Sequence, residues 1–190
     1  MFGSCDIHTD LALEDKERFE SDNVEVPGVS VEEFFDDEKD IQVTTVKILT
    51  ENGAKTMRKP IGTYITMEMA NLVLPDEDYH HEVSKQLAKY IGNILTVKSH
   101  EYVALVVGLG NRDVTPDALG PRAIEGLNVT RHLVKEYGRY AMDNEKVHMI
   151  SAIAPGVMAQ TGMETYEIIK GIVDTTHPDV VFVIDALAAR

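Results

Sequence analysis

Two aspartates follow apolar segments that are typical of buried parallel strands. Asp185 comes directly after Val180–Ile184, and Asp117 lies in the loop-helix junction that follows Val103–Val107. In α/β folds the carboxyl ends of parallel strands carry the chemistry, so we expect both carboxyl groups at one edge of a sheet. Two carboxyl groups that share a proton supply an acid and a base at neutral pH. Such a pair can activate water against a peptide carbonyl.

Each aspartate also has a simpler interpretation. Asp117 follows Thr115-Pro116 where a helix is predicted to begin, so it could cap that helix. Asp185 could be a capping or turn residue. The two acids could also bind a divalent metal together with a third ligand. The residues alone leave these alternatives open.

Other motifs for chemistry are incomplete. Gly108-Leu109-Gly110 follows a predicted strand, but the remainder of G-x-G-x-x-G is absent, so a dinucleotide site is disfavoured. Asn111 and His132 lie in segments similar to motifs of peptidyl-tRNA hydrolases. They are 21 positions apart, whereas the corresponding residues of that family are closer in sequence. The acidic net charge also disfavours tRNA as a ligand.

The segments that must position Asp117 and Asp185 alternate between strands and helices. Residues 100–190 indicate β-loop-α-β-α-β, with strands at 102–107, 149–153 and 180–184. Thr161 and Glu164 have the spacing of a capping box before the helix that precedes the last strand. Upstream, the pattern predicts strands at 41–49 and 64–69 and a helix over 77–95. We therefore expect an α/β three-layer sandwich with a largely parallel central sheet and an antiparallel edge meander.

The charge is concentrated near the N-terminus. The chain of 190 residues has 32 acidic and 18 basic side chains, and residues 1–40 hold 14 of the acids and 3 of the bases. This composition favours a solvated, partly mobile N-terminal arm that is most acidic at 32–38, or a removable or regulatory arm. It argues against direct nucleic-acid binding. Without a signal peptide or a membrane-length apolar run, the expectation is a soluble, cytoplasmic protein of one domain.

Several ordered segments resemble the germination protease family of spore-forming bacteria. The resemblance spans about residues 9–190 and is carried by Val107-Gly108-Leu109-Gly110-Asn111, by Val114-Thr115-Pro116-Asp117-Ala118-Leu119-Gly120-Pro121, by Ser151-Ala152-Ile153-Ala154-Pro155-Gly156-Val157-Met158 and by Ile184-Asp185-Ala186-Leu187-Ala188-Ala189-Arg190.

The resemblance implies an atypical endopeptidase with Asp117 and Asp185 as the catalytic pair, without a cofactor. Its implied substrates are the small acid-soluble spore proteins, which it begins to degrade during germination in the spore core. The implied form is a homotetramer that binds no membrane. The fold should be similar to that of hydrogenase maturation endopeptidases, so a metal-dependent peptidase on the same scaffold is the alternative.

The resemblance also implies a zymogen that removes its own propeptide. Thr9-Asp10-Leu11-Ala12 has the acid–apolar–alanine pattern that the family cleaves. We therefore expect residues 1–10 to be the propeptide, with cleavage between Asp10 and Leu11. Residues 11–190 should be the N-terminal part of a single peptidase domain, because the resemblance implies a longer protein. An inactive fragment that only associates with full-length subunits is a further alternative.

Overall fold

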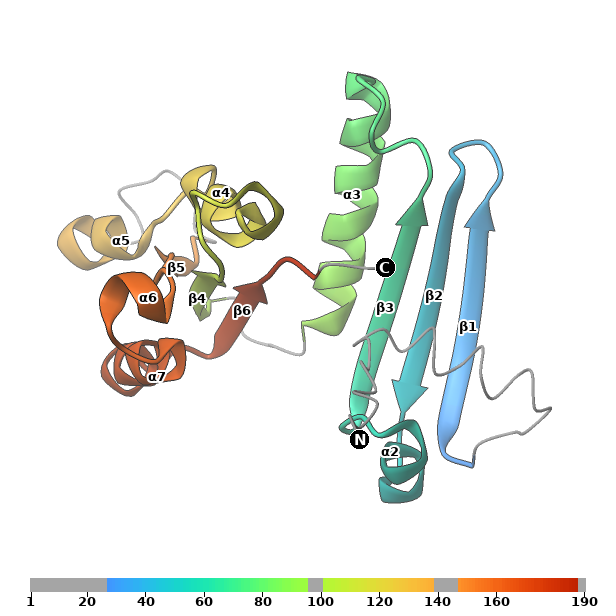
Figure 1. Cartoon of the computed structure of the whole chain (residues 1–190), viewed down its shortest axis with the longest axis horizontal. Coiled ribbons are helices and arrows are strands. Elements are labelled where there is room, and N and C mark those ends of the chain that lie inside the picture. The colour runs from blue at the N-terminus through green and yellow to red at the C-terminus, as the bar shows by residue number, and fades with distance from the viewer. Residues whose placement is uncertain (1–26, 96–100, 139–146, 188–190) are drawn as a thin grey trace, which may run out of the picture. The chain divides into compact units, whose positions relative to one another are not determined.

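The computed structural model describes residues 27–95, 101–138 and 147–187 (Figure 1). The chain divides into two compact units, Met1–Thr96 and Val97–Arg190. That both belong to one peptidase domain stays a prediction. No helix in these described ranges is long and apolar enough to cross a membrane.

The first unit is an antiparallel meander with two helices. Strands β1 (Val29–Asp36), β2 (Ile41–Ile48) and β3 (Gly62–Met69) pair in the order β1-β2-β3. Helix α2 (Glu51–Met57) follows β2, and helix α3 (Glu77–Ile94) follows β3. The Asp76 carboxylate caps α3 by accepting a hydrogen bond from the Tyr79 backbone N–H at 3.0 Å. The predicted strands and the helix over 77–95 are therefore confirmed.

The acidic segment of this unit corrects the expectation of a mobile arm. Strand β1 pairs with β2 along its whole length, from Val29 opposite Ile48 to Asp36 opposite Ile41. Its side chains still face solvent, since Phe34 and Phe35 are 52% and 53% exposed. Composition predicted the solvation correctly. It missed the strand because the backbone pairing depends on β2 and not on the charges of β1.

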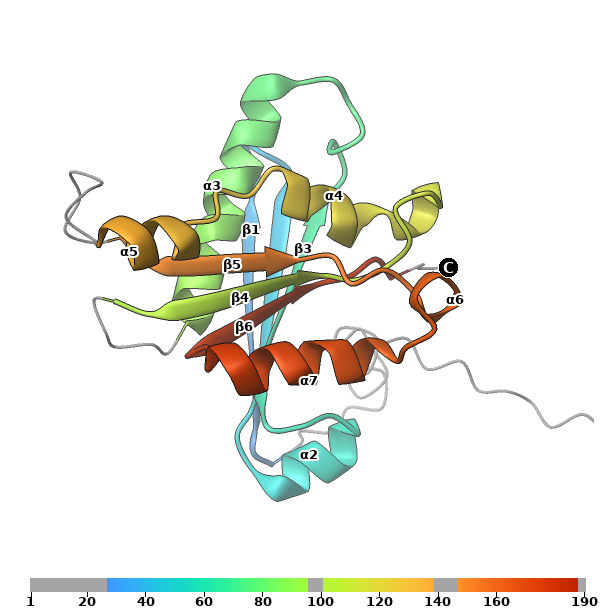
Figure 2. The same ribbon diagram turned by 90° about the vertical axis from the view of Figure 1, so that its left-hand side faces the viewer.

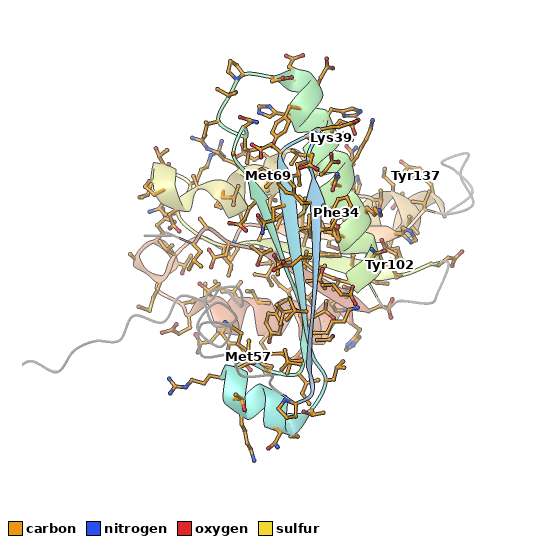
Figure 3. All side chains as sticks on the ribbon, turned by 90° about the vertical axis from the view of Figure 1, so that its right-hand side faces the viewer. Phe34, Lys39, Met57, Met69, Tyr102 and Tyr137 are labelled. Carbon is orange, nitrogen blue, oxygen red and sulfur yellow. The ribbon has the colours of Figure 1, made fainter. Side chains whose placement is uncertain are left out.

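Apolar side chains pack the meander at both of its ends. At one end Ile41 and Val43 contact Val83 of α3, and at the other end Val46 and Ile48 contact Met57 of α2. Figure 3 shows Met57 and Met69 at these opposite ends. Burial of such side chains is the main source of stability for the unit.

The second unit is a parallel sheet with helices on both faces (Figure 2). Strands β4 (Val103–Gly108), β5 (Met149–Ile153) and β6 (Val180–Ile184) pair in the order β5-β4-β6. Helices α4 (Leu119–Glu125) and α5 (Arg131–Tyr137) lie on one face and α7 (Thr165–Thr176) lies on the other. The short elements are the 3₁₀ helix η1 (Thr115–Asp117) and helix α6 (Met158–Thr161).

The predicted mixed α/β class, with a parallel sheet and an antiparallel meander, is confirmed. Among the described residues, the three meander strands and the three parallel strands form two separate sheets. A strand pattern reports which side chains are buried, but it does not identify the neighbouring strand.

Close backbone contacts hold α4 against the carboxyl ends of β4 and β6. A Cβ atom on Gly120 would lie 2.3 Å from the Leu109 carbonyl oxygen and 2.5 Å from the Ile184 carbonyl oxygen. The Leu109 N–H donates to the Ile184 carbonyl oxygen at 2.8 Å. This contact joins the ends of β4 and β6, and the segments that carry Asp117 and Asp185 follow from there.

Candidate active site

The Asp117 side chain closes the loop that follows β4. Its Oδ2 atom accepts a hydrogen bond from the Asn111 backbone N–H at 2.7 Å. Asp117 is half-buried at the end of η1, and its own N–H donates to the Val114 carbonyl oxygen at 2.8 Å. With Oδ2 engaged in this way, Oδ1 is the carboxylate oxygen left for a water molecule or a second acid.

Gly110 makes this arrangement possible. Its φ angle is +113°, and a Cβ atom there would lie 2.1 Å from the Asp117 carbonyl oxygen and 2.9 Å from Asp117 Oδ1. A residue with a side chain would be strained and would displace the carboxylate. The family-like segment Gly108-Leu109-Gly110-Asn111 therefore has a steric role at this loop.

The structure contradicts the interpretation of Asp117 as a helix cap. The residue that caps α4 is Ala118, and no side chain caps that helix. The carboxylate faces back toward Asn111. The sequence could not distinguish these arrangements, because both place an acid at the start of a helix.

Asp185 is exposed and follows β6 directly. Its Oδ1 atom accepts a hydrogen bond from the Ala186 N–H at 2.8 Å. This is a contact between neighbouring residues, and it leaves Oδ2 for another partner.

Adjacent strands bring the two acids to one edge of the sheet. Strands β4 and β6 are paired in parallel, with Gly108 opposite Ile184 (Figure 2). Asp117 and Asp185 are both in segments that follow these two strand ends. Coupling between their carboxyl groups stays a prediction.

A groove of about 430 Å³ lies beside the loop after β4. Its lining includes Gly110 and Arg112 from the loop after β4, and Ala154, Gly156 and Gln160 from the residues that follow β5. The Arg112 guanidinium forms an ion pair of 2.5 Å with Glu125, which also lines the groove. Three of the residues that line the groove, Gly110, Ala154 and Gly156, have small side chains or none.

Gln160 is a residue at this edge that sequence reasoning missed. Its Nε2 atom donates to Asn111 Oδ1 at 3.2 Å and so links α6 to the loop of Asp117. Its position shortly after β5 was the available signal, since segments that follow parallel strands gather at the same edge.

Asn111 and His132 are not brought together as a peptidyl-tRNA hydrolase-like site would require. Thr130, two residues before His132, donates its backbone N–H to the Ile150 carbonyl oxygen at 3.0 Å, near the start of β5. Asn111 lies beyond the opposite, carboxyl end of the neighbouring strand β4. Figure 2 shows α5 and the loop after β4 at opposite ends of the sheet.

The alternative metal site and the propeptide cleavage site are the two remaining predictions. Within the ranges that the structure describes, no cluster of three or more His, Cys, Asp or Glu side chains could hold a metal ion. The predicted cleavage site at Asp10 and Leu11 lies outside the described residues.

Fold and site together define an α/β protein with acids at the carboxyl ends of adjacent parallel strands. The chain belongs to the germination protease family, because the family model described as "Germination protease" matches residues 6–190.

Curated relatives agree with this assignment. Germination protease from Caldanaerobacter subterraneus subsp. tengcongensis is 50% identical over 97% of this chain and 55% of its own length. The protein of the same name from Clostridium tetani is 45% identical over 97% of this chain and 56% of its own length. The one from Bacillus subtilis is 41% identical over 97% of this chain and 50% of its own length. The chain thus spans about half the length of the curated relatives it matches.

Proposed function

We propose that this chain is part of an endopeptidase that begins the degradation of small acid-soluble spore proteins when a spore germinates. Its catalytic groups in this proposal are the carboxyl groups of Asp117 and Asp185. The observation that carries the proposal is that both acids follow adjacent parallel strands in a member of the germination protease family. The forespore is the proposed compartment and a homotetramer the proposed assembly, as the family resemblance implies.

The chemistry is acid–base catalysis by a coupled pair. One ionised carboxylate removes a proton from a water molecule, which then attacks the peptide carbonyl carbon. The other carboxyl group, in its protonated form, donates to the carbonyl oxygen. When the tetrahedral intermediate collapses, the carbon–nitrogen bond breaks, and the acid that received the water proton passes it to the leaving amine. The other carboxylate takes back its proton from the hydroxyl group that becomes the carbonyl oxygen of the product.

The groove beside the loop after β4 is the proposed binding site for the peptide. Its small lining residues, Gly110, Ala154 and Gly156, let a peptide backbone approach the loop closely. No step in this scheme requires a cofactor.

The scheme predicts that Asp117→Asn and Asp185→Asn each abolish cleavage in the full-length enzyme. We expect kcat to fall by at least about 10²-fold, the usual contribution of acid–base groups, with an unchanged circular dichroism spectrum. The substrate is a purified small acid-soluble spore protein, and its loss is followed by gel electrophoresis. Asp174→Asn is the matched control, because Asp174 lies on α7 and pairs only with Lys170 in the described structure.

Two results would count against the proposal. Either variant could retain full activity while folded, which would remove that acid from the mechanism. Wild-type activity could also be lost on treatment with a chelator and be restored by a divalent metal, which would favour the metal-dependent alternative.

The zymogen part of the proposal places self-cleavage between Asp10 and Leu11. N-terminal sequencing of the matured full-length enzyme should then begin Leu-Ala-Leu-Glu. The variant Asp10→Lys should remain unprocessed, and Asp117→Asn should leave the propeptide attached as well. Normal processing of Asp10→Lys would exclude this site.

A further inference from the structure

The backbone N–H that faces Asp117 is not held in place by its own loop alone. It belongs to the peptide between Gly110 and Asn111, and Gly110 has a φ angle of +113°. Rotation of a peptide next to glycine meets little steric resistance. The direction of the N–H, and with it the 2.7 Å hydrogen bond to Asp117 Oδ2, therefore depends on what restrains Asn111.

Within the loop, the Asn111 carbonyl oxygen accepts a hydrogen bond from the Val114 N–H at 3.2 Å. The Asn111 side chain provides a second restraint. Its Oδ1 atom accepts hydrogen bonds from the Asp113 N–H at 3.0 Å and from Gln160 Nε2 at 3.2 Å. The first contact lies within the loop. The second is the only contact that ties this side chain to α6, as far as the described residues show.

Gln160 is itself oriented by the segment that follows β5. Its Oε1 atom accepts from the Val157 N–H at 3.5 Å, which leaves Nε2 to donate to Asn111. Gly156 has a φ angle of +75°, and a Cβ atom there would lie 3.0 Å from Gln160 Oε1. The missing side chain at Gly156 thus makes room for the glutamine amide.

We propose that Gln160 is a positioning residue for Asp117, acting through Asn111. The Gln160 amide fixes the Asn111 side chain, the fixed Asn111 directs its backbone N–H at Asp117 Oδ2, and Oδ1 is thereby presented to the reacting water. Gln160 also lines the groove proposed for the peptide, and the positioning role concerns only its hydrogen bond to Asn111. The inference rests on the proposed function, since it assumes that Asp117 is catalytic.

Kinetics of the full-length enzyme on a purified small acid-soluble spore protein test this role. Gln160→Ala removes the link, and Asn111→Ala removes its acceptor while keeping the backbone N–H that faces Asp117. We expect each variant to lower kcat by about 10-fold, as small displacements of a catalytic group do, and to leave KM within about twofold. The double variant should be no slower than the slower single variant, because both changes break the same link.

The controls separate positioning from folding. Gln86→Glu makes a matched change on α3 of the other unit and should leave kcat unchanged. Gln160→Glu keeps the side-chain length but turns a donor into an acceptor that faces Asn111 Oδ1, so it should lower kcat at least as much as Gln160→Ala. If Gln160→Ala fails to fold, this isosteric variant supplies the comparison.

Three results would overturn the inference: an unchanged kcat in Gln160→Ala and Gln160→Glu, losses that multiply in the double variant, or a raised KM with normal kcat. The last would make Gln160 a substrate-binding residue. Failure of the proposed function is distinguishable, because Asp117→Asn would then retain activity. If Asp117→Asn is inactive and the Gln160 variants are normal, only the positioning role is lost.

Discussion

Both units bury apolar strand side chains, such as Ile41 in the meander unit and Val107 in the parallel unit, but they differ in how a helix meets the strands. In the meander unit, apolar side chains of the strands pack against α2 and α3, and Ile41, Val43 and Ile48 are no more than 1% exposed. In the parallel unit, α4 meets the strand ends through glycines, with Gly108 and Gly120 leaving no space for a Cβ atom. In the parallel unit, the backbone of α4 therefore lies close to the backbone of the strand ends, at the edge where Asp117 and Asp185 follow β4 and β6.

The largest expected loss of stability comes from adding one methyl group where α4 meets the strand ends of the parallel unit. Gly120→Ala would place a Cβ atom within 2.3–2.6 Å of three backbone atoms. Because backbone atoms cannot move aside cheaply, we expect a loss of about 3 kcal/mol in unfolding free energy, the upper range for overpacking. Hydrogen exchange should quicken in β4 and β6 and stay unchanged in the meander.

Gly92→Ala is the matched change in the other unit. Gly92 lies within α3, and nothing would come within 4 Å of a Cβ atom there. Alanine in a helix interior is favoured over glycine by about 0.5–1 kcal/mol, so exchange in α3 should slow slightly. Equal destabilisation by both substitutions would remove the distinction between the units.

The smallest expected effect concerns an ion-pair cluster on the meander unit. Hydrogen bonds from Lys39 and then Lys85 lower the pKa of Glu82 from 4.5 to about 2. A carboxylate whose pKa is lower in the folded state stabilises the fold above its unfolded pKa, and that contribution disappears as the pH falls toward 2.

Thermal unfolding of the wild type and Glu82→Gln as a function of pH tests this contribution. The wild type should be slightly more stable at pH 7, and the difference should shrink between pH 4.5 and 2, the interval over which Glu82 binds its proton. A difference that stays constant across this interval would mean that the two lysines do not stabilise ionised Glu82. The side chains of Lys39 and Glu82 are each 36% exposed, which explains the modest size.

The sequence predicted elements whose pattern is local. The apolar runs at β4 and β6 and the helical spacing of α3 are readable without knowledge of neighbours, and the structure confirms them. The capping box expected from Thr161 and Glu164 is wrong, because Thr161 ends α6 and the Glu164 N–H bonds to Glu167 Oε2 at 3.2 Å. The spacing alone did not identify Glu167 as the acid that accepts the hydrogen bond at the start of α7.

The sequence predicted the place of the candidate site better than its contacts. The rule that parallel strands end at one edge placed Asp117 and Asp185 after adjacent strands, as found. The hydrogen bond from Asn111 to Asp117 was not predictable, because it depends on the positive φ angle of Gly110. Gln160 was missed because its link spans 49 positions and is formed only by the fold.

The central claim, that Asp117 and Asp185 act as one catalytic unit, is tested most directly by combining their substitutions. In the full-length enzyme, kcat/KM on a small acid-soluble spore protein is measured for Asp117→Asn, Asp185→Asn and the double variant, each shown to be folded. Since residues that act as a unit are strongly non-additive, the double variant should be no slower than the slower single variant. Losses that multiply, or a folded single variant with normal kcat/KM, would contradict the account.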